Sequence, residues 1–229
     1  MYGKHTDKSF DEELQLLEKN VLQMGGIVEK QISDAIDALL SEDSSRGLAI
    51  IEKDKRINDL QDEVDRHTSR LLSLRQPVGV DLRYIVSASK IASDLERIAD
   101  YAANIAKHIH EWHILPVENA IESIVIMIRL AQGMLRDVLA AYPASDTERV
   151  IEIWHRDDQI DETYPKLLAD LTDCMKKGPE NIDSCTSLIF VARSIERIGD
   201  HITNIAEQIH YTATGRIYRG TDKAWAEKR

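Results

Sequence analysis

The sequence contains two near copies of one segment, ERIADYAANIA at residues 96–106 and ERIGDHITNIA at residues 196–206. The match extends to Ile-His at residues 109–110 and 209–210. Positions four apart lie on the same face of an α-helix. Each copy therefore places three oxygen-bearing side chains in one row: Glu96, Asp100 and Asn104 in the first copy, and Glu196, Asp200 and Asn204 in the second. The segment predicts a duplicated helical fold with a polar stripe on each half.

A 3.6-residue rhythm of apolar side chains runs through almost the whole chain. It is interrupted by a Ser- and Asp-rich turn near residue 43 and by turn signals at Pro77, Pro116, Pro143 and Gly178-Pro179. These breaks predict six helices, at residues 8–41, 45–75, 81–113, 117–142, 146–177 and 181–213. Pro165 falls inside the fifth helix and predicts a kink or an early end there.

The repeat decides how these helices are grouped. The third predicted helix matches the sixth, and the second matches the fifth more weakly at an offset of 103 residues. Long amphipathic helices joined by short breaks favour antiparallel neighbours. The sequence therefore predicts an all-α fold of two tandem three-helix bundles. The first bundle is expected at residues 8–114 and the second at 115–213, followed by a polar tail at 214–229.

Composition excludes several classes of protein. Of the 229 residues, 43% are hydrophobic, 30% are charged and 5% are aromatic, which favours a helical globular protein over a disordered or sheet-rich one. The net charge of −11 disfavours binding to nucleic acid. No apolar run approaches the length of a membrane span, and no secretory leader is evident. The two cysteines, Cys174 and Cys185, do not form a CxxC pair, which suggests a reducing compartment. Together these features predict a cytoplasmic protein.

Carboxylates carry the candidate chemistry, and the second repeat has the fuller set. Asp157 and Asp161 lie four apart on the fifth predicted helix, and Glu196 and Asp200 lie four apart on the sixth. Four carboxylates from two adjacent helices can enclose a divalent or trivalent cation, and their oxygens suit hard ions. The sequence therefore predicts a metal site, with Mg, Mn, Fe, Zn or Ca as the candidate ions.

The first repeat offers a poorer set of ligands. Its candidates are Asp54, Glu96 and Asp100, while Asn58 stands where the second repeat has a fourth carboxylate. This site is expected to bind metal more weakly or not at all. In either repeat a crowded carboxylate cluster repels itself, which favours a counter-charge.

Other interpretations stand beside the metal sites. The Glu-Arg neighbours at residues 96–97 and 196–197 are also typical of solvated surface ion pairs, which stabilise little. The three histidines His108, His110 and His113 lie near a predicted helix C-terminus, where the helix dipole explains them better than metal ligation does. No His-containing ligand motif accompanies the acidic pairs, which disfavours a di-iron centre of the ferritin type.

No catalytic residues are expected, because the chain lacks a P-loop, a GxGxxG segment and a nucleophile elbow. Gly199 falls within a predicted helix, where it is expected to permit close approach of a neighbouring helix. Two alternatives remain open. One is a metal-dependent enzyme, an oxidase or a phosphohydrolase; the other is a helical scaffold without metal.

Three motifs, in this order, resemble the PhoU family. They are MGGIVEKQ at residues 24–31, QPVGVDLR at residues 76–83 and the duplicated ERI(A/G)DxxxNIA segment. Together they are specific, and the resemblance covers the chain from about Phe10 to Tyr211.

The resemblance implies two three-helix bundles with pseudo-twofold symmetry in a non-enzymatic, cytoplasmic bacterial regulator. Such a regulator restrains phosphate uptake and the phosphate regulon when phosphate is plentiful. The implied partners are the ATPase of the phosphate-specific ABC transporter and a membrane sensor histidine kinase, and a homodimer is the common assembly. The family's E(D)xxxD motifs can hold metal clusters, and they map here onto Glu96/Asp100 and Glu196/Asp200.

Overall fold

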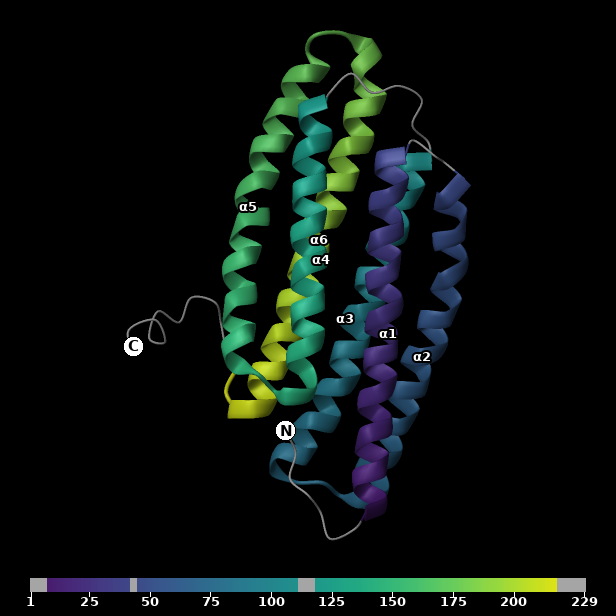
Figure 1. Ribbon diagram of the computed structural model, residues 1–229, viewed down its shortest axis with the longest axis vertical. Helices are drawn as coiled ribbons and strands as arrows, with labels where there is room; N and C mark the ends of the chain where they lie inside the picture. Colours follow the sequence, from purple (N-terminus) through teal and green to yellow (C-terminus); the bar gives the residue numbers. More distant parts are fainter. Residues whose placement is uncertain (1–7, 42–44, 111–117, 218–229) are drawn as a thin grey trace, which may run out of the picture.

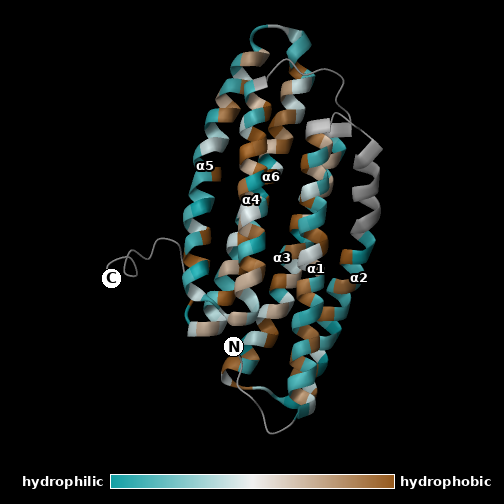
Figure 2. Cartoon of the chain, in the orientation of Figure 1, coloured by the Kyte–Doolittle hydropathy of each residue, from teal (hydrophilic) through white to brown (hydrophobic). Residues whose placement is uncertain are grey.

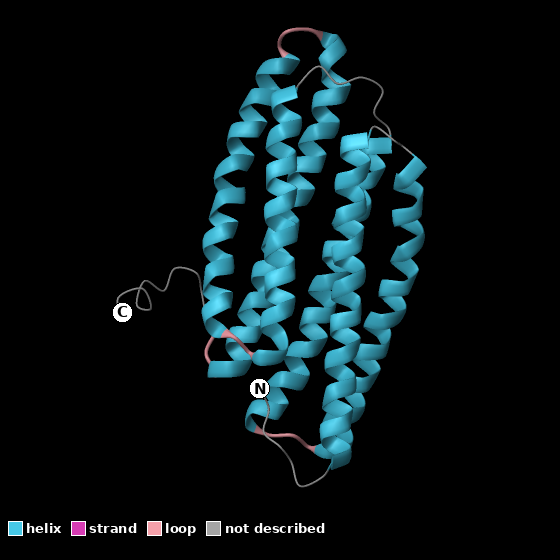
Figure 3. Cartoon of the chain, in the orientation of Figure 1, coloured by secondary structure: helices cyan, strands magenta, loops and turns pink. Residues whose placement is uncertain are grey.

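The structure is a computed structural model that describes the backbone of residues 8–41, 45–110 and 118–217. Side chains are described at residues 8–39, 55–108 and 119–217. Across this part of the chain the backbone is helical and contains no strand (Figure 3). The predicted all-α class is confirmed.

Long helices run back and forth along the molecule (Figure 1). Their bounds are α1 Lys8–Ser41, α2 Ser45–Arg75, α3 Gly79–His110, α4 Glu118–Ala144, α5 Thr147–Met175 and α6 Ile182–Thr214, with a short 3-10 helix, η1, at Pro179–Asn181. The six predicted helices are thereby confirmed, with ends that differ by at most three residues from the predicted ones.

Local chemistry at the predicted breaks accounts for the helix ends. Asp146 caps α5, because its Oδ1 accepts hydrogen bonds from the backbone N–H groups of Glu148 at 3.2 Å and Arg149 at 3.1 Å. The helix α6 ends at Gly215, whose φ of 70° lies in the left-handed region that favours glycine. The Gly215 N–H donates to the carbonyl of Tyr211 at 2.8 Å and closes the last turn.

Of the two predicted effects of Pro165, a kink or an early end of the helix, the early end is wrong. The helix α5 continues for ten residues beyond Pro165, to Met175. Proline at this position removes one N–H, which would otherwise bond the carbonyl of Asp161. Both residues are on the exposed side of α5, where water can satisfy that carbonyl.

The helices pack as two three-helix bundles, α1–α2–α3 and α4–α5–α6. Each helix contacts both other members of its own bundle, and the bundles are joined through α3 against α6 and α1 against α4. The helices α2 and α5 therefore lie at opposite outer sides of the molecule (Figure 1). The predicted domain boundary at residues 114 and 115 falls outside the described residues.

Apolar residues of the repeated segment lie at the centre of this arrangement. Leu95, Ile98, Ile195 and Ile198 have no exposed surface, and they belong to one core that is continuous across both bundles. Burial of such a side chain contributes roughly 1.5–3 kcal/mol. Figure 2 shows apolar residues concentrated on α4 and α6, while polar residues predominate on the outer helix α5. None of the described helices has the length and apolarity needed to cross a bilayer.

Candidate metal centre

Two predicted ligands of the second repeat lie one turn apart on α6. Between them, the Arg197 guanidinium reaches both: its Nε is 3.5 Å from Oε2 of Glu196, and its Nη1 is 2.9 Å from Oδ2 of Asp200. The side chains are partly accessible, with 22% of Glu196 and 40% of Asp200 exposed. Arg197 therefore neutralises part of this negative charge from the solvent side.

The other two predicted ligands, Asp157 and Asp161, lie on α5, and the four carboxylates are near enough to influence one another electrostatically. Burial raises the pKa of Asp157 from its usual 3.8 to about 7, and further increases come from the negative charges of Asp161, Asp200, Asp158 and Glu196. Burial followed by the charge of Asp200 also raises the pKa values of Asp161 and Glu196. The structure thus places the four predicted residues of the α5–α6 seam (Asp157, Asp161, Glu196 and Asp200) within electrostatic range of one another, although they do not converge on one point.

One oxygen of this seam has no hydrogen-bond partner among the residues that the structure describes. Oδ1 of Asp157 is buried and forms no hydrogen bond within the described part of the chain. It lies directly against Gly199, so closely that a Cβ at residue 199 would overlap it. An unsatisfied buried carboxylate oxygen beside three other acids is an electrostatically costly arrangement, which a bound cation would relieve.

The α2–α3 seam (Asp54, Glu96 and Asp100) repeats the arginine arrangement of the other seam. Nε of Arg97 lies 3.7 Å from Oε2 of Glu96, and Nη1 lies 3.4 Å from Oδ2 of Asp100. Asn58 is exposed on α2, and the side chain of Asp54 lies outside the described residues. In place of Gly199, this repeat has Ala99.

Of the predicted row of Glu196, Asp200 and Asn204, the last residue contacts α3 rather than the α5–α6 seam. The Asn204 side chain donates from Nδ2 to Oδ1 of Asp94 on α3, at 3.4 Å. The same Oδ1 lies 2.8 Å from Nδ1 of His201. Asn204 therefore takes part in a contact between the two repeats.

Asp94 and His201 were not identified from the sequence, although a difference between the two repeats marks both positions. The two repeats differ in side-chain chemistry at these positions: Ser194 is the counterpart of Asp94, and Tyr101 is the counterpart of His201. The rings of Tyr101 and His201 lie 5.8 Å apart, so the residues that differ meet where α3 and α6 face each other.

The donor set of the α5–α6 seam fits a hard cation in its chemistry. All four donors are carboxylates, their charges repel one another, and one buried oxygen is unsatisfied. As the side chains stand, no three His, Cys, Asp or Glu residues with described side chains converge closely enough to hold an ion. Binding would therefore require the carboxylates to rotate toward a common point, which their partial exposure permits.

The predicted histidine cluster contributes nothing to this seam in the described residues. The ring of His108 stacks on Phe190 with centroids 5.0 Å apart and an interplanar angle of 6°. The side chains of His110 and His113 lie outside the described residues.

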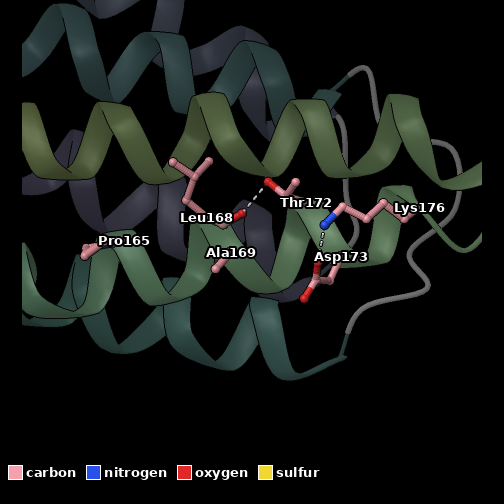
Figure 4. Close-up of a pocket in the computed structure, with 6 residues that line it drawn as sticks. All are labelled: Pro165, Leu168, Ala169, Thr172, Asp173 and Lys176. Atoms are coloured by element: carbon pink, nitrogen blue, oxygen red, sulfur yellow. Dashed lines mark hydrogen bonds and ion pairs between the residues drawn. The ribbon is translucent and has the colours of Figure 1, made fainter.

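Two surface cavities among the described residues lie away from both acidic seams. One, of about 340 Å³, lies on α5 beyond the seam and is lined by Pro165, Leu168, Ala169, Thr172, Asp173 and Lys176 (Figure 4). At its edge Lys176 Nζ pairs with Asp173 Oδ1 at 2.7 Å. The other, of about 380 Å³, is lined by Gln23, Gly26, Ile27, Lys30 and Arg56. Neither cavity contains a predicted metal ligand.

Comparison with known families and proteins gives a consistent result. The PhoU domain model matches this chain twice, at residues 21–109 and 124–209, and all seven predicted metal ligands fall inside these ranges. A Caulobacter vibrioides (strain NA1000) protein described as a phosphate-specific transport system accessory protein PhoU homolog is 45% identical over 213 residues, which cover 93% of each chain. The Escherichia coli K12 phosphate-specific transport system accessory protein PhoU is 35% identical over 217 residues, covering 95% of this chain and 90% of that protein.

Solved structures share the fold along nearly the whole chain. The crystal structure of PhoU from Pseudomonas aeruginosa has a TM-score of 0.85 at 33% identity, covering 90% of this chain and all of that one. The phosphate transport system regulatory protein PhoU from Streptococcus pneumoniae has a TM-score of 0.85 at 35% identity, covering 92% of this chain and 99% of that one. The helical architecture is therefore shared with these proteins over nine-tenths or more of this chain.

Proposed function

The chain belongs to the PhoU family, and on that premise we propose that it is an accessory regulator of phosphate transport. The observation that carries the proposal is that relatives named as accessory proteins of the phosphate-specific transport system match over more than nine-tenths of this chain. The match therefore includes both bundles and both acidic stripes rather than a single shared module.

In this proposal the protein is a non-enzymatic adaptor in the cytoplasm. It links the ATPase of the phosphate-specific ABC transporter to a sensor histidine kinase, and it restrains phosphate uptake and the phosphate regulon when phosphate is plentiful. Helices of about 30 residues are about 45 Å long, which provides separate surfaces for two partners. The negative surface would favour basic patches on those partners.

The proposed role of the α5–α6 seam is to bind a hard cation through Asp157, Asp161, Glu196 and Asp200. When bound, the cation would supply positive charge that offsets the mutual repulsion of these carboxylates and holds α5 against α6. The protein's own residues fix where this happens, because α5 and α6 carry two carboxylates each at one-turn spacing. The α2–α3 seam would bind more weakly, since Asn58 supplies an amide where the other seam has a carboxylate.

Affinity purification from cells grown in plentiful phosphate tests the adaptor role. The tagged chain should recover the transporter ATPase and the sensor kinase, both identified by mass spectrometry. A tagged unrelated acidic helical protein serves as the control for charge-driven capture. Recovery of neither partner, from cells in which both are expressed, would contradict the proposal.

A homodimer is the assembly that we propose alongside this role. Light scattering coupled to size-exclusion chromatography should give a mass of twice the 26.0 kDa of one chain. A mass of one chain at micromolar concentration would rule out a stable dimer.

A further inference from the structure

The two copies of the repeated segment differ at one buried position, which lies between the Glu and the Asp that both copies share. Residue 99 is alanine in the first copy, and residue 199 is glycine in the second. Both residues are buried on the face of their helix that packs against a neighbour. Glycine in the middle of a long helix is unfavourable relative to alanine, so its presence at the centre of α6 calls for a local reason.

Contact geometry supplies that reason. A Cβ built at residue 199 would overlap Oδ1 of Asp157 and lie 3.5 Å from Cδ1 of Ile160. The atoms nearest to it are side-chain atoms of α5, and none belongs to the α5 backbone. Gly199 therefore makes room for a carboxylate of the neighbouring helix α5.

The carboxylate that lies against Gly199, that of Asp157, is where the acidic pair of α5 meets the acidic pair of α6. Asp157 is on α5 with Asp161, and its seat at Gly199 is adjacent to Asp200 and one turn from Glu196 on α6. Its Oδ1 is buried without a hydrogen-bond partner among the described residues, so the seat is not explained by a bond to the protein. In the first repeat the methyl group of Ala99 occupies the equivalent position and is fully buried.

We propose that Gly199 is a positioning residue, which by lacking a Cβ seats the Asp157 carboxylate in the α5–α6 seam and makes this seam the stronger of the two metal sites. The inference rests on the proposed metal role of the seam. On this inference, the difference in metal affinity between the two repeats comes from Ala99 and Gly199 as well as from Asn58.

Gly199→Ala tests the inference, because the group that it displaces is the end of a flexible side chain. The variant should retain the far-UV circular dichroism of the wild type and unfold cooperatively. Its affinity for Mn²⁺ alone, measured by calorimetry and by electron paramagnetic resonance of the free ion, should fall about tenfold or more. Gly133→Ala is the matched control, since a Cβ there meets only Arg156 Nη1 at an ordinary 3.8 Å and should leave Mn²⁺ affinity unchanged.

An Asp157→Ala background makes the test specific. If Gly199 acts through Asp157, then adding Gly199→Ala to Asp157→Ala should change Mn²⁺ affinity by less than about twofold. The double variant also lacks the overlapping carboxylate, so it should fold even if Gly199→Ala alone does not.

The outcomes separate this inference from the proposed metal role. A wild-type protein that binds no Mn²⁺ would overturn both. Wild-type binding with the same affinity in Gly199→Ala would overturn the positioning role alone. An equal loss of affinity from Gly199→Ala with and without Asp157 would also overturn it, because the glycine would then act by another route.

Discussion

Nδ1 of His201 lies 2.8 Å from Oδ1 of Asp94, and this contact joins α6 of the second bundle to α3 of the first. Both side chains are largely buried, with 21% of His201 and 17% of Asp94 exposed. The repeat does not provide a symmetric partner, because Ser194 and Tyr101 stand at the equivalent positions. The interface between the bundles is therefore polar and asymmetric at this point, although the surrounding core is apolar and duplicated.

Asp94→Ala should destabilise the protein by about 1–2 kcal/mol, because it removes the acceptor used by both His201 and Asn204 and leaves a half-buried ring without its partner. Urea unfolding followed by circular dichroism measures the change. Asp173→Ala is the control: that residue pairs with Lys176 at an exposed site and should have no measurable effect. Equal stability of the Asp94 variant and the wild type would show that the contact contributes nothing.

The stability of the metal-free protein should decrease as pH rises toward 7 because of Asp157. Its pKa is raised in the folded state to about 7 from the usual 3.8. Between these values the folded protein holds a proton that the unfolded chain has released, so the free energy of unfolding falls with rising pH and the loss is complete above pH 7. The raised pKa values of Asp161 and Glu196 act in the same direction.

Asp157→Asn isolates this effect, since the amide keeps the size of the carboxyl group but does not titrate. Urea unfolding in the presence of a chelator, at several values from pH 5 to pH 8, should show the variant gaining stability relative to the wild type as pH rises. If the free energy of unfolding of the variant and that of the wild type changed with pH in parallel over this range, Asp157 would titrate normally in the folded state.

The two acidic seams should differ in metal binding. Glu196→Gln/Asp200→Asn should lower the affinity for Mg²⁺ or Mn²⁺ by about tenfold or more, because it removes half of the carboxylates of the α5–α6 seam. The matched variant Glu96→Gln/Asp100→Asn makes the same change in the α2–α3 seam and should have a smaller effect. Calorimetry gives both affinities, and the metal should raise the unfolding temperature of the wild type. A larger loss from the first-repeat variant would reverse the proposed order of the sites.

Cys174 and Cys185 should react slowly with a thiol reagent in the folded protein. Both are buried where the end of α5 meets the start of α6. Burial, with a hydrogen bond that the Cys185 thiol donates to Cys174, raises the pKa of Cys185 to about 11, so little thiolate is present at neutral pH. Absorbance after addition of Ellman's reagent should show two thiols only once urea is added. Rapid reaction of both thiols without urea would contradict the burial of this pair.

The sequence by itself determined the helices, their grouping and the identity of the acidic residues. The apolar rhythm, the turn residues and the repeat are local signals, because a helix places residues three and four apart on one face whatever surrounds it. The placement of Glu196 one turn from Asp200, and of Asp157 one turn from Asp161, follows from that geometry alone.

The tertiary structure decided which of these faces meet. The rotation and depth at which α6 packs on α3 and α5 depend on the fit of the whole interface, which no single helix specifies. That packing turned Asn204 toward Asp94, paired His201 with the same carboxylate and seated Asp157 against Gly199. The sequence marked two acidic stripes and, through Asn58, an inequality between them, whereas the seat of Asp157 against Gly199 depends on how α5 and α6 pack.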